Sequence, residues 1–333
     1  MFGAAAARAR SEVFGELATL VGAGVSIGHA LGDLGEDLGQ RHLGSTLVRM
    51  GRRVSSGTTL ADAMRDEHGA FEPLTVAMIE AGEQAGRLDE ALRGVAQYHE
   101  RDLELRHLLT RELAYPLVLL GAIIVIPTAA QFIIKWLTGS LAAAVVAAAL
   151  RLAVTLIYLG VPAGIIYAIY RSLSSTETGR RRLDAIKLGI PIIGGVVRRV
   201  VMARFCRALA SLYSSGVLMG SALRLAAAAA GNAVVADELT RGAAKVDAGG
   251  KLSDALEQAP HVPRTVVRMI RTGEDSGEID RMAHNVAEHY EMEAQTAIKQ
   301  MAVTITPIAV LIAAVIIGMM YIGSFLQIYS GMQ

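Results

Sequence analysis

Three long stretches of this 333-residue chain contain no charged side chain. They cover residues 113–134, 152–170 and 302–328, and each is almost wholly apolar. A helix needs roughly 20 apolar residues to cross the hydrocarbon core of a bilayer, so each stretch is long enough. The composition agrees, because 53% of the residues are hydrophobic and only 19% are charged. We therefore predict three transmembrane helices.

The segment 135–151, between the first two stretches, carries only Lys135 and Arg151 as charges. It can form a short outer link, a fourth span, a re-entrant piece or the beginning of one long helix that continues to Tyr170. We favour the helical extension, because Arg151 can reach an interface from near a helix end but is costly at the centre of a membrane.

Charges that flank the stretches predict the orientation. Segment 171–182 carries four arginines, whereas the chain after Lys299 carries no charge. The positive-inside rule places residues 171–301 in the cytoplasm and the C-terminus outside, and two spans return residues 1–112 to the cytoplasmic side. The two cytoplasmic domains have net charges of −5 and +4. Opposite charge can favour packing of one domain on the other, and ordinary solvated surfaces explain it equally well.

The chain also repeats itself. Residues 20–31 match residues 212–223 with six identities in twelve, at an offset of 192. Residues 78–89 match residues 269–280 with six identities in twelve, at an offset of 191. Blocks in the same order at nearly constant spacing indicate a duplicated domain. Two prolines that keep the second offset fall inside predicted membrane helices, which tolerate proline: Pro116 and Pro307.

Both copies look helical. No stretch shows sustained strand alternation, and Leu88, Leu92 and Val95 recur at helical spacing. We expect about five or six helices in each copy. The predicted fold is all-α, a polytopic membrane protein with two duplicated cytoplasmic helical-bundle domains and three transmembrane helices. Its segments are domain 1–112, span 113–134, link 135–151, span 152–170, domain 171–301 and span 302–328.

The matching segments 78–89 and 269–280 both end in one short motif, Gly-Glu-x-[Ser/Ala]-Gly-x-[Leu/Ile]-Asp. The paired glycines interrupt one helical pattern before another begins, so we expect the motif to shape the turn between two helices. The aspartate then lies in the first turn of the new helix, where negative charge suits the helix dipole. These motif residues are our candidate structural or partner-binding site: Gly82, Glu83, Gly86, Asp89, Gly273, Glu274, Gly277 and Asp280.

The second motif lies in an acidic cluster formed by Glu274, Asp275, Glu278 and Asp280. The cluster can bind a cation, dock a partner or serve as a polar turn between helices. We favour the polar turn, because the alternating ligand spacing of an EF-hand is absent. We expect no metal site.

Catalytic patterns are missing from the sequence. It contains no HExxH zinc motif, no phosphate-binding loop and no Ser/His/Asp arrangement that can be argued. The single Cys206 excludes an internal disulfide and a CxxC site, and the net charge of +1 gives no reason to expect nucleic-acid binding. The predicted spans lack ionisable groups, which disfavours transport. We therefore expect a protein that is not an enzyme and binds no cofactor.

Two helical domains that end in this motif, each followed by a proline-containing apolar stretch, resemble the type II secretion F and type IV pilus inner-membrane platform proteins. The resemblance covers residues 12–330. It implies a scaffold in the bacterial inner membrane, present as a homo-oligomer. The implied partners are a cytoplasmic assembly ATPase, pilin or pseudopilin transmembrane helices and other inner-membrane assembly proteins. A pilus, a secretion machine and a DNA-uptake structure stay open. The alternative is a membrane-anchored adaptor or a transporter subunit unrelated to pili.

Overall fold

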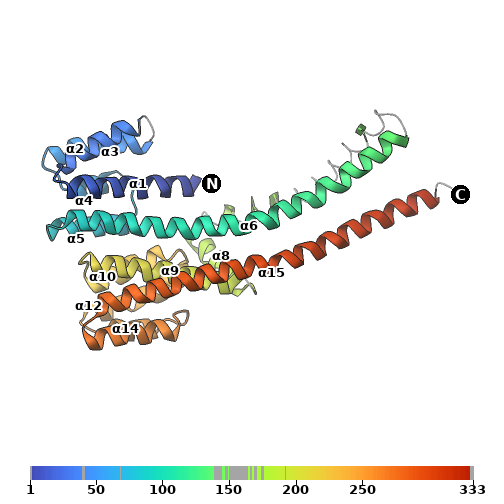
Figure 1. The fold of residues 1–333 in the computed structure, drawn as a ribbon. Coiled ribbons are helices and arrows are strands. Elements are labelled where there is room, and N and C mark those ends of the chain that lie inside the picture. Colours follow the sequence, from blue (N-terminus) through green and yellow to red (C-terminus); the bar gives the residue numbers. More distant parts are fainter. Residues whose placement is uncertain are drawn as a thin grey trace. The chain divides into compact units, whose positions relative to one another are not determined.

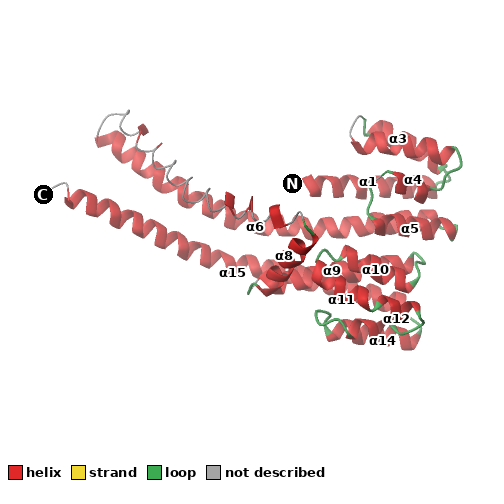
Figure 2. Ribbon diagram, turned by 180° about the vertical axis from the view of Figure 1, so that it is seen from behind, coloured by secondary structure: helices red, strands yellow, loops and turns green. Residues whose placement is uncertain are grey.

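A computed structural model of the chain describes residues 2–39, 42–67, 69–138, 176–191 and 193–330, with scattered positions from 145 to 173. In these residues the only regular structure is α-helix, so the all-α prediction is confirmed for them (Figures 1 and 2). The helices are α1 (Phe2–Gly22), α2 (Ile27–Asp37), α3 (His42–Ser55), α4 (Leu60–Asp66), α5 (Pro73–Gln84), α6 (Leu88–Thr138), α8 (Glu177–Gly189), α9 (Ile193–Ser214), α10 (Met219–Ala229), α11 (Ala233–Arg241), α12 (Ala243–Asp247), α13 (Leu252–Glu257), α14 (Arg264–Ser276) and α15 (Ile279–Ser330).

The chain forms two compact units. The first combines residues 1–107 with residues 188–295 and therefore holds both copies of the duplicated domain. We call residues 1–107 repeat 1 and residues 188–295 repeat 2. The second combines residues 108–187 with 296–333. The segment boundaries expected from the sequence stay predictions, because the predicted link and second span lie largely outside the described residues.

The duplication is visible helix by helix. Helices α2 and α10 begin 192 residues apart, as do α4 and α13, whereas α6 and α15 begin 191 residues apart. One helix differs, because the equivalent of α3 is divided at Gly242 into α11 and α12. A Cβ atom at Gly242 would lie 2.6 Å from the Cβ of Ala255, so glycine lets α13 approach closely at that break.

Side-chain caps mark the beginning of two helices. Thr59 accepts a hydrogen bond from the backbone N–H of Asp62 at the start of α4. Asn232 accepts bonds from Val234 and Val235 at the start of α11. Such caps satisfy N–H groups that have no partner inside the helix. The apolar faces of the helices then pack inward, and the largest fully buried side chains come from both repeats: Leu17, Leu31, Met50, Met78, Ile79, Leu92, Met202, Phe205 and Leu212.

Two helices are far longer than the rest. Helix α6 has 51 residues and α15 has 52, and each begins in a repeat and continues into the second unit. Pro307 lies inside α15, and α6 passes through position 116, whose side chain lies outside the description. Among the described residues, no helix meets the length and hydropathy that a membrane crossing requires. The three transmembrane helices are therefore not confirmed.

Candidate functional site

Glu83 of the first motif binds a helix that lies earlier in the chain. Its carboxylate accepts hydrogen bonds from the backbone N–H groups of Leu60 at 2.6 Å and Ala61 at 3.0 Å. These are the first two residues of α4, where N–H groups lack intrahelical partners and the helix dipole favours negative charge. Glu83 therefore ties the end of α5 to the beginning of α4 through charge-assisted bonds.

Glu274 of the second motif repeats this arrangement. Its carboxylate accepts hydrogen bonds from the N–H groups of Leu252 at 2.5 Å and Ser253 at 3.1 Å, the first two residues of α13. Two residues of the same type, 191 positions apart, thus bind equivalent helix ends. This agreement between the copies indicates that the glutamate is required by the architecture of the domain.

The first glycine of each motif permits a close approach between helices. A Cβ atom on Gly82 would lie 2.2 Å from the Cβ of Ala91 in α6. A Cβ atom on Gly273 would lie 2.8 Å from the Cβ of Met282 in α15. Each distance is too short for two carbon atoms. The long helix can therefore pack directly on the helix before it only because these positions lack a side chain.

The second glycine of each motif ends a helix. Gly86 has φ +67° and Gly277 has φ +74°, in the left-handed region that favours glycine. The following N–H groups, of Arg87 and Glu278, bond back across the turn at 2.8 Å and 2.9 Å to the carbonyl oxygens of the first motif glycines. The glycines therefore shape the turn as expected, while the glutamates act on a different helix.

The motif aspartates lie where the sequence predicts. Asp89 is in the first turn of α6 and pairs with Arg93 at 3.1 Å, and Asp280 is in the first turn of α15. Negative charge at both positions stabilises the N-terminus of a long helix. Each motif thus ends one helix and begins the longest helix of its repeat.

The acidic cluster near the second motif is divided among separate contacts. Glu274 binds the backbone of α13, Asp275 bonds Lys251 at 2.6 Å, and Glu278 pairs with Arg281. Within the part of the chain that the structure describes, no group of three or more His, Cys, Asp or Glu residues could hold a metal ion. The geometry is therefore that of a polar turn.

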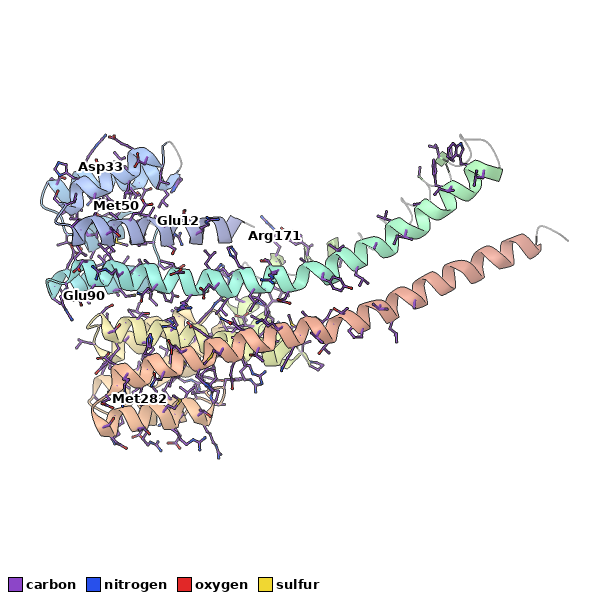
Figure 3. The ribbon with its side chains drawn as sticks, in the orientation of Figure 1. Glu12, Asp33, Met50, Glu90, Arg171 and Met282 are labelled. Carbon is purple, nitrogen blue, oxygen red and sulfur yellow. The ribbon has the colours of Figure 1, made fainter. Side chains whose placement is uncertain are left out.

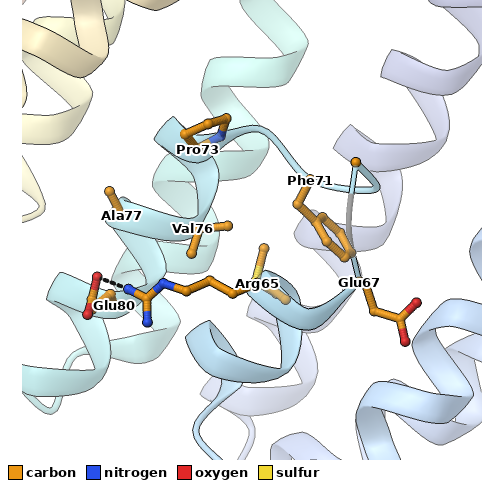
Figure 4. Close-up of a pocket in the computed structure, with 9 residues that line it drawn as sticks. Arg65, Glu67, Phe71, Pro73, Val76, Ala77 and Glu80 are labelled. Atoms are coloured by element: carbon orange, nitrogen blue, oxygen red, sulfur yellow. Dashed lines mark hydrogen bonds and ion pairs between the residues drawn. The ribbon is translucent and has the colours of Figure 1, made fainter.

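Repeat 1 contains a groove of about 270 Å³ between α4 and α5. Phe71 and Val76 line it, and Arg65 reaches Glu80 along its edge (Figure 4). The two carboxylates of the groove, Glu67 and Glu80, each pair with an arginine. The lining residues are Met64, Arg65, Glu67, Gly69, Phe71, Pro73, Val76, Ala77 and Glu80. The groove offers an apolar surface with charged edges.

The equivalent place in repeat 2 has an ion pair of reversed polarity. There Glu257 occupies the position of Arg65, and Arg271 that of Glu80, with 2.7 Å between the charged groups. Sequence reasoning did not find this exchange. Aligning the two copies position by position would have detected it, because both partners change sign together.

Three further charged or titratable side chains are buried and were not predicted. Arg207 and Glu291 form a bidentate pair at 2.5 Å and 2.6 Å, and each side chain is about 10% exposed. His99 lies 3.2 Å from the hydroxyl of Thr75, and its ring stacks on Phe14. Burial lowers the pKa of His99 to about 4, and the nearby positive charge of Arg10 adds to this effect. These groups lie in the interior of the repeats and form no reactive constellation.

Two repeats of one helical domain, each closed by a glycine turn whose glutamate caps an earlier helix and each extended by a long helix, define a duplicated all-helical protein without a catalytic arrangement in its described residues. The family model described as "Type II secretion system (T2SS), protein F" matches this chain twice, over residues 14–134 and 205–327. The chain belongs to that family. The double match also confirms the duplication.

Curated relatives cover nearly the whole chain. The type IV pilus assembly protein PilC of Thermus thermophilus is 33% identical in an alignment 330 positions long, and the match covers 94% of this chain and 80% of the relative. PilC of Pseudomonas aeruginosa is 27% identical over 326 residues, covering 94% and 87%. The type II secretion system protein F of Xanthomonas campestris pv. campestris is 29% identical over 332 residues, covering 94% and 80%.

Proposed function

We propose that this protein is the inner-membrane platform of a type IV pilus or type II secretion machine. In this role it couples a cytoplasmic assembly ATPase to the insertion of pilin or pseudopilin into the fibre. The observation that carries the proposal is the continuity of α6 and α15. Each begins at the glycine turn of a repeat and continues through one of the uncharged stretches, residues 113–134 and 302–328.

This continuity suits a mechanical role. A helix of 51 residues is about 75 Å long and transmits displacement along its axis, because its backbone hydrogen bonds resist bending. Movement imposed on a repeat then reaches the far end of the helix that leaves it. The proposal requires no active site and no cofactor, since the ATPase supplies the energy.

The proposed topology has three membrane helices, at residues 113–134, 152–170 and 302–328. Both repeats and the N-terminus lie in the cytoplasm, and the C-terminus lies outside. The uncharged stretches and the arginines after residue 170 support this arrangement. Partners in the membrane are pilin or pseudopilin helices and other inner-membrane assembly proteins, and the protein binds no nucleic acid.

Affinity purification of the tagged full-length protein from membranes of the cells that produce it tests the proposal. We expect recovery of a hexameric ATPase and of a pilin-like subunit, identified by mass spectrometry. Recovery of neither, from membranes that retain other complexes, would instead favour the alternative of an adaptor or transporter subunit unrelated to pili.

A second variant tests the mechanical coupling. Insertion of a flexible Gly-Gly-Ser-Gly-Gly-Ser-Gly segment after Leu109 interrupts α6 between repeat 1 and the first uncharged stretch. The matched control inserts seven alanines, which add about two helical turns and keep the helix continuous. We expect the flexible insertion to abolish fibre assembly while ATPase recovery persists, and the alanine insertion to retain more assembly. Equal assembly by both variants would contradict coupling through α6.

A further inference from the structure

The two repeats contact each other through different faces. The beginning of α5 in repeat 1 faces α10 in repeat 2, and Pro73 and Leu74 line a groove of about 270 Å³ between them. On the other side of this groove lie three α10 residues: Leu225, Ala228 and Ala229. Beside them, Asp102 of α6 pairs with Arg204 of α9 at 2.9 Å. We call this contact the repeat seam.

Because the domain is duplicated, each repeat possesses both faces of the seam. Among the described contacts between the repeats, repeat 1 contributes α5 and α6, and repeat 2 contributes α9 and α10. The remaining two faces are α1–α2 of repeat 1 and α14–α15 of repeat 2. Within the first compact unit, α2 and α14 lie at opposite edges, on either side of the seam (Figures 1 and 2).

The unused face of repeat 1 is acidic. The equivalents of the three α10 groove residues lie 192 positions earlier, on α2, and all three are exposed carboxylates: Asp33, Glu36 and Asp37. Their spacing places them on one side of the helix, and Figure 3 labels Asp33 there. In the described part of the chain, none of these carboxylates has an ion-pair partner. Charged groups thus stand where repeat 2 has apolar side chains that line the seam.

The unused face of repeat 2 is basic. The equivalent of Pro73 is Arg264, and the equivalent of Ala77 is Arg268. Both arginines are exposed, lie one helical turn apart on α14, and have no ion-pair partner among the residues that the structure describes. Three unpaired carboxylates and Arg264 therefore occupy positions whose equivalents line the seam, and Arg268 lies one helical turn further along α14.

We propose that a second copy of this chain docks head to tail, with α14 of one copy on α2 of the other. The contact repeats the geometry of the α5–α10 seam and replaces its apolar groove residues with opposite charges. Complementary charge fixes the partner and the register of such a contact. Because the two faces differ, the interface is heterologous and can extend to a ring or a row of copies.

One part of the seam does not carry over. The positions equivalent to Asp102 and Arg204 are Glu293 and Glu12, which are both acidic. Each of these glutamates already pairs with an arginine of its own repeat. The intermolecular contact is therefore centred on α2 and α14. The proposal depends on the geometry of the repeats and not on the proposed function.

Cysteine cross-linking in whole cells tests the contact. Two differently tagged full-length copies are co-expressed, one with Glu36→Cys and the other with Arg264→Cys, and treated with a short thiol-specific bifunctional reagent. The native Cys206 is buried and does not react readily. We expect a cross-linked product that carries both tags. A matched control pairs Glu36→Cys with Arg241→Cys, an exposed arginine at the end of α11, and should give none.

Reversing the charges on the two helices distinguishes a specific contact from cross-linking by random collision. Adding Arg268→Glu to the Arg264→Cys copy should lower the cross-linked fraction about tenfold, equivalent to about 1.4 kcal/mol. Adding Asp33→Arg and Asp37→Arg to the Glu36→Cys copy should restore it. Equal cross-linking by the control pair, no rescue, or cross-links from position 36 only to other proteins would each overturn the proposal.

Discussion

Removing the motif glutamates should destabilise the repeats more than removing any exposed glutamate nearby. In Glu83→Ala, the N–H groups of Leu60 and Ala61 lose a charged acceptor that lies within 3.0 Å. Loss of a helix N-terminal acceptor costs about 1 kcal/mol, and loss of its charge beside the helix dipole adds about 1 kcal/mol. We therefore expect Glu83→Ala to lower the free energy of unfolding by about 2 kcal/mol, and Glu274→Ala to do the same.

The assay is thermal unfolding of the full-length protein in detergent, followed by circular dichroism. For a unit of this size, a loss of about 2 kcal/mol corresponds to a fall in melting temperature of about 4–8 °C. Glu83→Gln keeps one oxygen acceptor and loses the charge, so its effect should be about half as large. The matched control is Glu80→Ala, which removes an exposed ion pair with Arg65 and should cost about 0.5 kcal/mol.

The order of the variants decides the argument. Capping of α4 predicts that alanine at position 83 is worse than glutamine, and that glutamine is worse than alanine at position 80. If Glu83→Ala and Glu80→Ala had the same effect, the bonds to α4 would contribute no stability. If only one of Glu83→Ala and Glu274→Ala lowered the free energy of unfolding, the two glutamates would not have equivalent roles in the two repeats.

Three further predictions follow from the geometry of the repeats. Gly82→Ala should lower the free energy of unfolding by about 2 kcal/mol, because the new Cβ would clash with Ala91. Gly277→Ala should lower it by about 1 kcal/mol, because the φ of Gly277 is positive. The control is Gly32→Ala, which has open space around it and should not destabilise the protein. Unfolding in denaturant measures this order, and a destabilised Gly32→Ala would contradict it. Because the pKa of folded His99 is lowered to about 4, the unfolded state binds a proton at this residue between pH 6.5 and about 4, whereas the folded state does not. The free energy of unfolding should therefore fall by about 3 kcal/mol as the pH decreases through that window. His99→Gln should remove this part of the pH dependence, and an unchanged slope would refute it. Arg207→Met should cost about 3–5 kcal/mol by leaving Glu291 buried without a partner, and the double variant Arg207→Met/Glu291→Leu should recover much of the loss in the same denaturation assay.

The sequence was sufficient for the features that depend on local pattern. The offset of 191–192 residues predicted two copies, and the structure places equivalent helices at that offset. The motif glycines predicted the turns, because a glycine pair that interrupts helical periodicity has few other uses. The absence of strand alternation predicted an all-α fold. Each of these inferences needs only neighbouring residues or the comparison of two segments.

Long-range contacts escaped the sequence for a physical reason. The partners of Glu83 are backbone N–H groups 22 and 23 residues earlier, and every residue except proline has such a group. No side-chain pattern marks them. The pair between Arg207 and Glu291 escaped for a similar reason, since 84 residues separate its members and position 15 in repeat 1 is a glycine. Predicting these contacts requires the packing of the helices, which periodicity alone does not give.

Positions inside a repeat and positions at its edge have changed differently since the duplication. Positions that hold one repeat together have stayed alike, since both copies use glutamate to cap a short helix before the longest helix begins. Positions at the edge of a repeat have changed sign or polarity, as at Arg65 and Glu257 or along α2 and α10. The exchange at Arg65 and Glu257 lies within each repeat, whereas the difference between α2 and α10 concerns the face through which repeat 2 meets repeat 1. The second difference therefore bears on which neighbour each copy binds, as the proposed α2–α14 contact requires.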